Sequence, residues 1–373
     1  MVHHARLEQL AIIHNTSGVT WQAVAVPRFA EYAPGEGIKT LAGLRSGWKE
    51  RLSANLASGR VATFDDSIVD DEAVPESFDA AEQWPQCAKI IGDIRDQGNC
   101  GCCWAFAGAE VSSDRACIAT NASFELPISA QDVCFCTIEG MGCFGGDIDG
   151  PFFHVNEDGA VTGGQVNASG PFGGGYCSAF SLPHCHHHGP RGDDPYPDEG
   201  KPGCPEPPGV FGPDCPTKCD KSAAPEHKHF DKDRVYFKGR VEWAGRDNPP
   251  WPSDKKVEKQ IMKMVLKGGP VSVGFTVYSD FENYAGGIYH HVHGDEAGGH
   301  AVKLVGWGAE NGTKYWRLAN SWNKYWGENG YFRIKRGVKD SCGMEDSAVG
   351  PAHNVKWKRG KPPDEDVREV TSK

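Results

Sequence analysis

Cys103 lies where a cysteine can become a nucleophile. Residues 97–101 form a turn punctuated by glycine, and residues 104–120 are rich in Ala and free of Pro, which predicts a helix that begins at this cysteine. A helix N-terminus favours negative charge, and together with an adjacent imidazolium it can lower a thiol pKa from about 8.5 to about 3.5–7.5. Gln97 could donate its side-chain amide to an oxyanion that forms beside the sulfur, with the Cys103 N–H as the second donor.

Two later segments could supply the base and the group that orients it. His300 follows two glycines, which let its imidazole approach a partner closely, and a histidine beside a thiol can serve first as base and then as acid. Asn320 could fix the imidazole tautomer, and Trp322 could shield that hydrogen bond from water. Each residue alone would more often be structural, so the prediction of a Cys-His-Asn site depends on their combination.

Residues 97–106 resemble the active-site segment of the papain-family cysteine proteases. The sequence Cys-Gly-Cys-Cys-Trp matches the signature of that family except at Cys102, where the family has Ser or Ala. Residues 84–87, residues 113–115 and a Cys-His-His loop make cathepsin B the most similar branch. The resemblance implies a thiol protease that hydrolyses peptide bonds without a cofactor or metal. Its catalytic residues would be Cys103, His300, Asn320 and Gln97.

The resemblance also implies an α+β, papain-like fold of two lobes, and the sequence pattern agrees with it. Ala-rich stretches between Val74 and about Gly164 favour helices in the half that carries Cys103. Apolar residues alternate along 271–277 and again along 332–334, which predicts strands in a β-rich second half. A substrate cleft would lie between the two lobes.

Several residues would contact substrate if the resemblance holds. Gly145 and Gly146 would form a cleft wall whose backbone pairs with an extended peptide by strand addition. Gly299 and Trp322 would contribute from the side of His300.

Two departures from the family bear on specificity. Ser347 stands where cathepsin B places a Glu at the floor of its S2 pocket, which removes the partner of an arginine at the second residue before the cut. Asp147 stands where the family usually has an aromatic residue; it either supplies a carboxylate to a neighbouring subsite or faces water. We therefore predict faster cleavage after Phe-Arg than after Arg-Arg.

Residues 185–204 resemble the occluding loop of cathepsin B. His187 and His188 align with the imidazoles that bind the C-terminal carboxylate of a substrate, which implies release of C-terminal dipeptides alongside internal cleavage. Asp96 matches one acid that tethers this loop, whereas Tyr325 stands in place of the other. The Cys-rich insertion that contains this loop, of a kind that marks cathepsin B within the family, accounts for Cys-to-His and Cys-to-Asn separations beyond the usual range of roughly 130–150 residues. The loop between Cys185 and Cys204 is also longer than in the family.

The 14 cysteines and four Asn-X-Ser/Thr sequons indicate an oxidising, secretory-route protein. The candidate glycosylation sites are Asn15, Asn121, Asn167 and Asn311. The resemblance suggests the disulfides Cys87–Cys117, Cys100–Cys143, Cys134–Cys215, Cys177–Cys219 and Cys185–Cys204. Apart from Cys103, this pairing leaves Cys102, Cys136 and Cys342, among which a Cys102–Cys136 bridge is an open alternative.

Composition excludes two classes of partner. The formal net charge of -11 argues against nucleic acid, and no run of about 18 or more apolar residues could span a membrane. Residues 7–13 are too short and polar for the core of a signal peptide, so we expect a leader to have been removed. The family expectation is secretion or an acidic compartment such as a lysosome or endosome.

Three regions are expected along the chain. Residues 1–73 lack Cys and end in an acidic stretch, so they are interpreted as a separate, accessible segment, and residues 20–23 resemble a cathepsin B propeptide. We expect this propeptide to inhibit a peptidase domain over residues 74–350; a flexible linker without an inhibitory role is the alternative. Residues 351–373 are charged and are predicted to be a disordered extension. The expected partners are peptide and protein substrates, the propeptide itself and cystatin-type inhibitors.

Two other classes of protein fit parts of the pattern. A structural zinc protein could use clustered Cys and His, but the spacings fit no paired set of tetrahedral ligands. A catalytically dead binding protein on the same fold would be expected to lack the thiol, the imidazole or the amide, and all are present. An epoxide thiol trap that labels only Cys103 would discriminate the enzyme from both.

Overall fold

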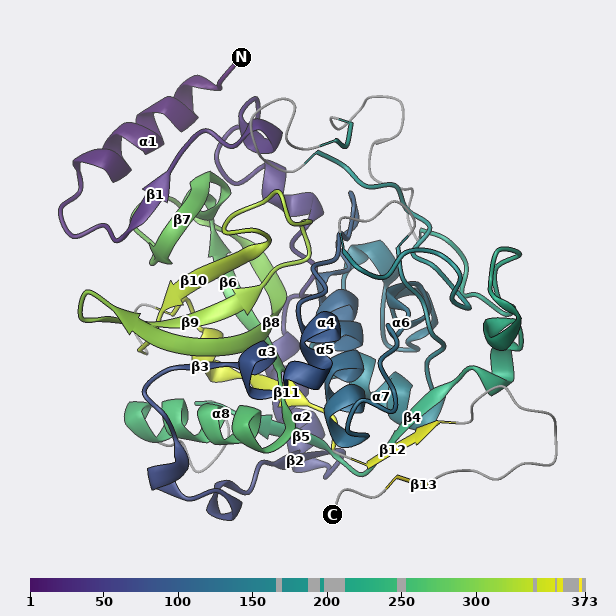
Figure 1. Cartoon of the computed structure of the whole chain (residues 1–373). Helices are drawn as coiled ribbons and strands as arrows, with labels where there is room; N and C mark the ends of the chain where they lie inside the picture. Colours follow the sequence, from purple (N-terminus) through teal and green to yellow (C-terminus); the bar gives the residue numbers. More distant parts are fainter. Residues whose placement is uncertain are drawn as a thin grey trace.

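The protein has two lobes, one mainly helical and one built on a β-sheet (Figure 1). The computed structural model describes residues 1–165, 170–186, 195–197, 212–246, 253–337, 341–352, 354–357 and 369–370. The predicted α+β, two-lobed architecture is confirmed. Among the described residues, no helix is both long and apolar enough to cross a membrane.

The helical lobe is organised around α5 (Cys103–Ala119), which confirms the helix predicted to begin at Cys103. Its first 15 residues are buried, and small side chains let neighbouring elements approach: a Cβ on Gly108 would lie 2.2 Å from Pro151 Cβ in α7. On its other side α5 packs against strand β8 of the second lobe. The other helices of this lobe are α3 (Ala80–Gln83), α4 (Ala88–Ile91), α6 (Ala130–Cys136) and α7 (Gly150–Glu157).

The second lobe is a ten-stranded sheet of mostly antiparallel strands with the order β1-β7-β10-β9-β8-β6-β11-β5-β2 and β3 paired to β8. Residues 271–275 of β6 are buried on both faces, because residues of the N-terminal segment cover the face that carries Gly274. Helix α8 (Asp254–Gly268) buries its apolar stripe in the core of this lobe. The strands are β1 (Trp21–Ala23), β2 (Val61–Thr63), β3 (Phe78–Asp79), β5 (Val241–Ala244), β6 (Val271–Tyr278), β7 (Tyr284–Tyr289), β8 (Glu296–Glu310), β9 (Thr313–Ala319), β10 (Tyr331–Lys335) and β11 (Ala348–Gly350).

Residues 1–73 are an integral part of this fold, so the expectation of a separate, accessible segment is wrong. The segment contains α1 (His4–Asn15) and α2 (Trp48–Ala57), and its strands β1 and β2 occupy the two ends of the sheet. Ile13 and Phe29 are buried in the same core as the strands of the sheet. The apolar residues of the segment, which the sequence shows only as short clusters, find their partners in the other part of the chain.

The beginning of the C-terminal region is also ordered. Strand β12 (Asn354–Trp357) pairs with β4 (Val235–Lys238) on one side and with β13 (Glu369–Val370) on the other. Val355 is buried, and Trp357 packs edge-on against Phe124. A disordered extension from residue 351 onward is therefore wrong for these strands, whereas residues 358–368 and 371–373 lie outside the described part.

Four disulfides occur among the described residues, three of them as predicted: Cys87–Cys117, Cys100–Cys143 and Cys177–Cys219. The fourth is Cys136–Cys215, so the predicted pair Cys134–Cys215 is wrong, and so is the alternative bridge Cys102–Cys136. Both candidate cysteines lie on α6, but Cys134 faces the core whereas Cys136 is half-buried near the exposed Cys215. The prediction Cys185–Cys204 involves Cys204, which lies outside the described residues.

Candidate active site

Cys103 lies at the junction of the two lobes, where α5 begins beside β8. Its Sγ accepts hydrogen bonds from the N–H of Ala301 in β8, at 3.4 Å, and from the N–H of Gly43, at 3.2 Å. The thiol is fully buried. The sequence predicted that the thiol lies at a helix N-terminus and near the segment of His300. It gave no indication of the contact with Gly43.

His300 is held by an amide, as the sequence predicted. Its strand β8 pairs with β6, which places His300 opposite Phe275. The imidazole Nε2 lies 2.8 Å from Asn320 Oδ1, an oxygen that can only accept, so Nε2 carries the proton and Nδ1 of the neutral ring is left as a base. Nδ1 is buried, and the backbone of Leu41 in the N-terminal segment acts on the imidazole as a hydrogen-bond acceptor. The buried ring of Trp322 lies 5.1 Å from the imidazole and screens the Nε2 bond from water.

Gln97 lies on the turn before α5 and is fully buried. Its Nε2 donates to the carbonyl oxygens of Leu41, at 2.9 Å, and Cys100, at 2.7 Å. Its Oε1 accepts from Ser321 Oγ at 2.7 Å, which fixes the direction in which the amide N–H groups point. The predicted oxyanion donor thus points at two carbonyls, one on its own turn and one, that of Leu41, in the N-terminal segment.

Residues 41–45 cross the candidate site, where Leu44 forms isolated β-bridges with Gly146 and Gly299. Gly146 N–H donates to Gly43 O at 2.9 Å, and Arg45 N–H donates to Gly146 O at 3.1 Å. On the opposite side Leu44 N–H donates to Gly299 O at 3.0 Å. Gly146 and Gly299 therefore make the backbone contacts predicted for a peptide in the cleft, and residues 43–45 occupy them.

Glycine is required at two of these contacts. A Cβ on Gly43 would lie 2.0 Å from Gly101 O and 3.2 Å from Cys103 Sγ, so only glycine fits this closely over the thiol. A Cβ on Gly146 would lie 2.4 Å from the ring of Trp104, and one on Gly145 would lie 2.8 Å from Gly43 O. The N-terminal segment can therefore pass this close to the cleft wall only because both have glycine at the points of contact.

Burial under this segment keeps the thiol and the imidazole uncharged. Burial raises the pKa of Cys103 to about 12, although its backbone N–H donors act in the opposite direction. Burial also lowers the pKa of His300 to about 4, although the bond to Asn320 favours the charged ring. Between these values both groups are neutral, and a thiolate–imidazolium pair does not form in the covered site.

Asp147 does not face water; it binds two arginines of the N-terminal segment. Arg51 donates from Nε and Nη2 to its two carboxylate oxygens, both at 2.7 Å, and Arg45 adds bonds of 2.6 and 3.3 Å. Burial alone would raise the pKa of Asp147, but the two arginines outweigh it and lower the pKa. The sequence contained a signal that was missed, because both arginines belong to the basic stretch 45–51.

The region around Ser347 is filled by apolar side chains of the same segment. A Cβ on Gly274 would lie 2.8 Å from both Leu44 Cδ1 and Trp48 Cη2, so these two side chains cover this part of β6. Ser347 is buried, and its Oγ has no hydrogen-bond partner among the described residues.

The two neighbouring acids are already engaged. Glu345 accepts from Trp316 Nε1 and from Gly337 N–H, both at 2.8 Å, and Asp346 pairs with Lys49 and Arg246.

His187 and His188 lie outside the described residues. Asp96, the expected tether, pairs with His184 at 3.3 Å and accepts from Asn323 Nδ2 at 3.2 Å. His184 stacks on Tyr196, which also packs edge-on against Tyr325. An aromatic contact therefore stands where the family has the second acid.

The candidate glycosylation sites are exposed where they are described. Asn15, Asn121 and Asn311 all lie at the surface, whereas Asn167 lies outside the described part.

A two-lobed fold with a cysteine at a helix N-terminus and an amide-held imidazole across the junction defines a thiol-dependent hydrolase. The comparison with known proteins agrees: residues 74–352 match the papain family cysteine protease, and the chain belongs to this family. It is 41% identical over 292 residues to cathepsin B-like cysteine proteinase 4 of Caenorhabditis elegans, covering 77% of this chain and 78% of that protein. Cathepsin B-like cysteine proteinase 5 of the same organism is 40% identical over 315 residues, with 81% and 82% covered.

A solved structure shows the same arrangement over nearly the whole chain. Procathepsin B S9 from Trypanosoma congolense aligns with a TM-score of 0.64 and 28% identity, covering 93% of this chain and 96% of that one. The protein is thus a cysteine protease similar to cathepsin B, and its fold, N-terminal segment included, is similar to that of a proform.

Proposed function

We propose that Cys103, His300, Asn320 and Gln97 hydrolyse peptide bonds once residues 1–73 have left the cleft. The observation that carries this proposal is the imidazole whose Nε2–H is fixed by Asn320, which leaves Nδ1 as a base in the junction that holds the thiol. His300 takes the thiol proton, and the Cys103 thiolate attacks the carbonyl carbon. Gln97 and the Cys103 N–H hold the oxyanion, His300 protonates the leaving amine, and water then releases the acyl group.

Active-site titration tests this assignment. Cys103→Ala is expected to lower kcat by several orders of magnitude, because the remaining groups cannot form the acyl intermediate. Cys102→Ser is the matched control, since it changes the adjacent thiol to a residue that the family signature carries. Substantial turnover by Cys103→Ala, or loss of epoxide labelling in Cys102→Ser alone, would refute the assignment.

We propose that residues 1–73 are the propeptide, residues 74–350 the peptidase domain and residues 351–373 an extension. The support is the contact of Gly43 with Cys103 Sγ and the occupation of Gly146 and Gly299 by residues 43–45. Four disulfides support passage through an oxidising secretory route, and we propose secretion or an acidic endosome-like compartment as the destination. The uncovered cleft would also accept cystatin-type inhibitors.

We propose that the enzyme also releases C-terminal dipeptides, with His187 and His188 binding the terminal carboxylate. The support is the sequence of this loop and the pairing of its base through His184 with Asp96. The double variant His187→Ala, His188→Ala is expected to lower dipeptide release about ten- to a hundredfold and to spare internal cleavage. Equal losses in both assays would reject the role.

We propose that Asp147 binds a basic residue of the substrate at the third position before the cut. Leu44 covers the apolar region near Gly274, and Arg45, the next residue along, docks on Gly146 and reaches Asp147. A substrate residue one step beyond the apolar pocket would meet the same carboxylate.

Matched peptides test this subsite. Arg-Leu-Arg should be cleaved about tenfold faster than Gln-Leu-Arg, since one charge-assisted hydrogen bond is worth about 1.5 kcal/mol. Asp147→Asn should remove the difference and leave Gln-Leu-Arg unaffected. A preference for Arg that survives this substitution would locate the basic subsite elsewhere.

A further inference from the structure

Cys102 and Cys134 are two thiols that peptide hydrolysis does not use. Cys102 is the N-cap residue of α5, directly before Cys103, and Cys134 lies on α6. Both side chains are buried, and neither is part of a disulfide. Cys102 is also the residue at which this chain departs from the active-site signature of its family.

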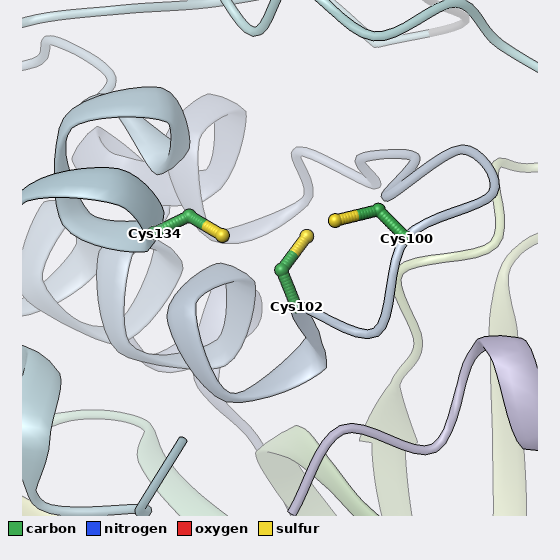
Figure 2. A group of neighbouring side chains, drawn as sticks. All are labelled: Cys100, Cys102 and Cys134. Carbon is green, nitrogen blue, oxygen red and sulfur yellow. The ribbon is translucent and has the colours of Figure 1, made fainter. Parts of the chain in front are cut away.

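The two thiols share one small space with a disulfide. The sulfur atoms of Cys100, Cys102 and Cys134 lie within 4.8 Å of one another. In Figure 2 the Cys102 sulfur lies between the other two, and the three side chains point toward one another. Cys100 is bonded to Cys143, so one disulfide already lies beside the two thiols.

A metal site fits these sulfurs less well. Structural zinc takes four ligands, whereas Cys100 is committed to a disulfide and only two thiols remain. Cys102 and Cys134 are hydrogen-bonded to each other, which places the two thiols in direct contact. Two thiols in contact are suited to bond with each other.

We propose that Cys102 and Cys134 close a disulfide that ties the N-terminus of α5 to α6. Disulfide bonding requires the sulfurs to approach from within 4.8 Å to about 2.05 Å. The first turn of α5 would be fixed directly, because Ala105 and Phe106 donate their N–H groups to Cys102 O at 3.0 and 3.1 Å. The new bond would lie beside Cys100–Cys143, which fixes the preceding turn.

The oxidant is a small disulfide of the secretory route, such as oxidised glutathione. One cysteine thiolate attacks a sulfur of the small disulfide and releases one small thiol, leaving a mixed disulfide. The second cysteine thiolate then attacks the protein sulfur of that bond and releases the second small thiol. Two cysteine thiols are oxidised and one small disulfide is reduced to two thiols. Because both cysteines are buried, the reaction takes place during folding or after local opening.

Counting thiols in the full chain tests this proposal. The protein carries Cys103→Ala to prevent self-cleavage, so the readout is independent of the proposed function. It is incubated with oxidised or with reduced glutathione, denatured in the presence of a maleimide and weighed intact. The oxidised sample should carry two fewer maleimides, and fragment spectra should place the new bond between Cys102 and Cys134. Cys102→Ser and Cys134→Val, each added singly, should abolish the loss.

Three results would overturn the proposal. In the first, the chain that has both Cys102 and Cys134 keeps both thiols free in oxidised glutathione. In the second, the Cys134→Val variant still loses two thiols. The third is a stoichiometric zinc ion that protects both thiols from the maleimide until a chelator removes it. If a variant does not fold, the bond map of the chain with both cysteines decides alone.

Discussion

At the scale of single residues, the covered site predicts a thiol that is present but unreactive. Burial raises the pKa of Cys103 to about 12, so the thiol is protonated at pH 7. The neutral His300 beside it offers no positive charge to stabilise the thiolate. Reactivity should therefore report directly on whether residues 41–45 lie over the site.

Alkylation of Cys103 by iodoacetamide should be at least a hundredfold slower in the full chain than in a processed chain that begins at Val74. Removal of the segment admits water and lets the thiolate–imidazolium pair form, which lowers the thiol pKa. The measurement is the rate at which the Cys103 peptide gains mass between pH 5 and 8. Equal rates in the two forms would show that Gly43 does not shield the sulfur in solution.

Specificity at the second residue before the cut also follows from single residues. Ser347 carries no charge, Glu345 is bound by Trp316 and Gly337, and Asp346 is paired with Arg246. We predict a kcat/KM for Phe-Arg peptides about tenfold or more above that for Arg-Arg peptides, because the arginine loses its water without gaining an ion pair.

Ser347→Glu is the matched variant for this prediction. It restores the acid that cathepsin B has at this position and should raise cleavage after Arg-Arg while leaving Phe-Arg nearly unchanged. Comparable rates for the two peptides in the unsubstituted enzyme would mean that Asp346 reaches the pocket once Lys49 has left.

At the scale of elements, the contact between α5 and β8 contains a buried charge cluster. Lys303 Nζ on β8 lies 3.0 Å from Asp114 Oδ2 and 3.6 Å from Glu110 Oε2, both on α5. One ammonium group faces two carboxyl groups, so one negative charge would be left uncompensated. Burial accordingly raises the pKa of Glu110 to about 7 and that of Asp114 to about 6.

This cluster should make the protein more stable in acid. Each carboxyl has a higher pKa folded than unfolded, so its stabilisation is complete below about pH 4 and is lost as the pH rises through 6 and 7. In a Cys103→Ala chain, the thermal unfolding midpoint should fall between pH 5 and 8. Glu110→Gln should reduce the fall in the free energy of unfolding over this pH range by up to about 3 kcal/mol. The matched substitution Glu226→Gln, at an exposed position, should leave the pH dependence unchanged. An unchanged pH profile in Glu110→Gln would contradict the assignment.

The elements also show which features a sequence can reveal. The helix at Cys103 and the strands around His300 were predictable, because composition and alternation are local signals. The pairing of Cys136 rather than Cys134 with Cys215 was not, because both lie on α6 and only its packing decides which one faces the core. The path of Gly43 over Cys103 was also hidden, since it depends on contacts between residues far apart in the chain.

At the scale of the whole molecule, residues 1–73 clasp the peptidase domain at both ends of its sheet. β1 pairs with β7 at one end, and β2 pairs with β5 at the other. Between them, residues 41–45 cover the site, with Gly43 over Cys103. A segment held this way leaves only when both edge strands and residues 41–45 detach, so we expect chain cleavage to be a more direct route to activity than a shift in docking.

Titration of the ion pairs that hold the segment supports the same conclusion. The pKa of Asp147 is lowered by Arg45 and Arg51, against the effect of burial, and the pKa of Asp71 is lowered to about 2 by Lys263 and Lys259. Because these pKa values are depressed, the attraction is fully present above about pH 4 and is lost only as the pH falls further. At pH 5 these ion pairs between residues 1–73 and the rest of the chain are therefore still charged.

The full chain should therefore be latent at pH 7, and at pH 5 it should gain activity only as it shortens towards Val74. Below pH 4 the gain should be faster, because the Asp147 and Asp71 carboxylates take up protons more readily once the segment has detached, so their ion pairs stabilise the docked form less. In Asp147→Asn, activity should already appear faster at pH 5. It is measured with a peptide whose third residue before the cut is neutral, so that the proposed subsite plays no part. Activity and chain length are followed together, and a Cys103→Ala chain reveals cleavage by contaminants.

The reference is the chain that begins at Val74, obtained by cleavage of the folded protein. If the full chain is as active as this reference, the segment does not inhibit.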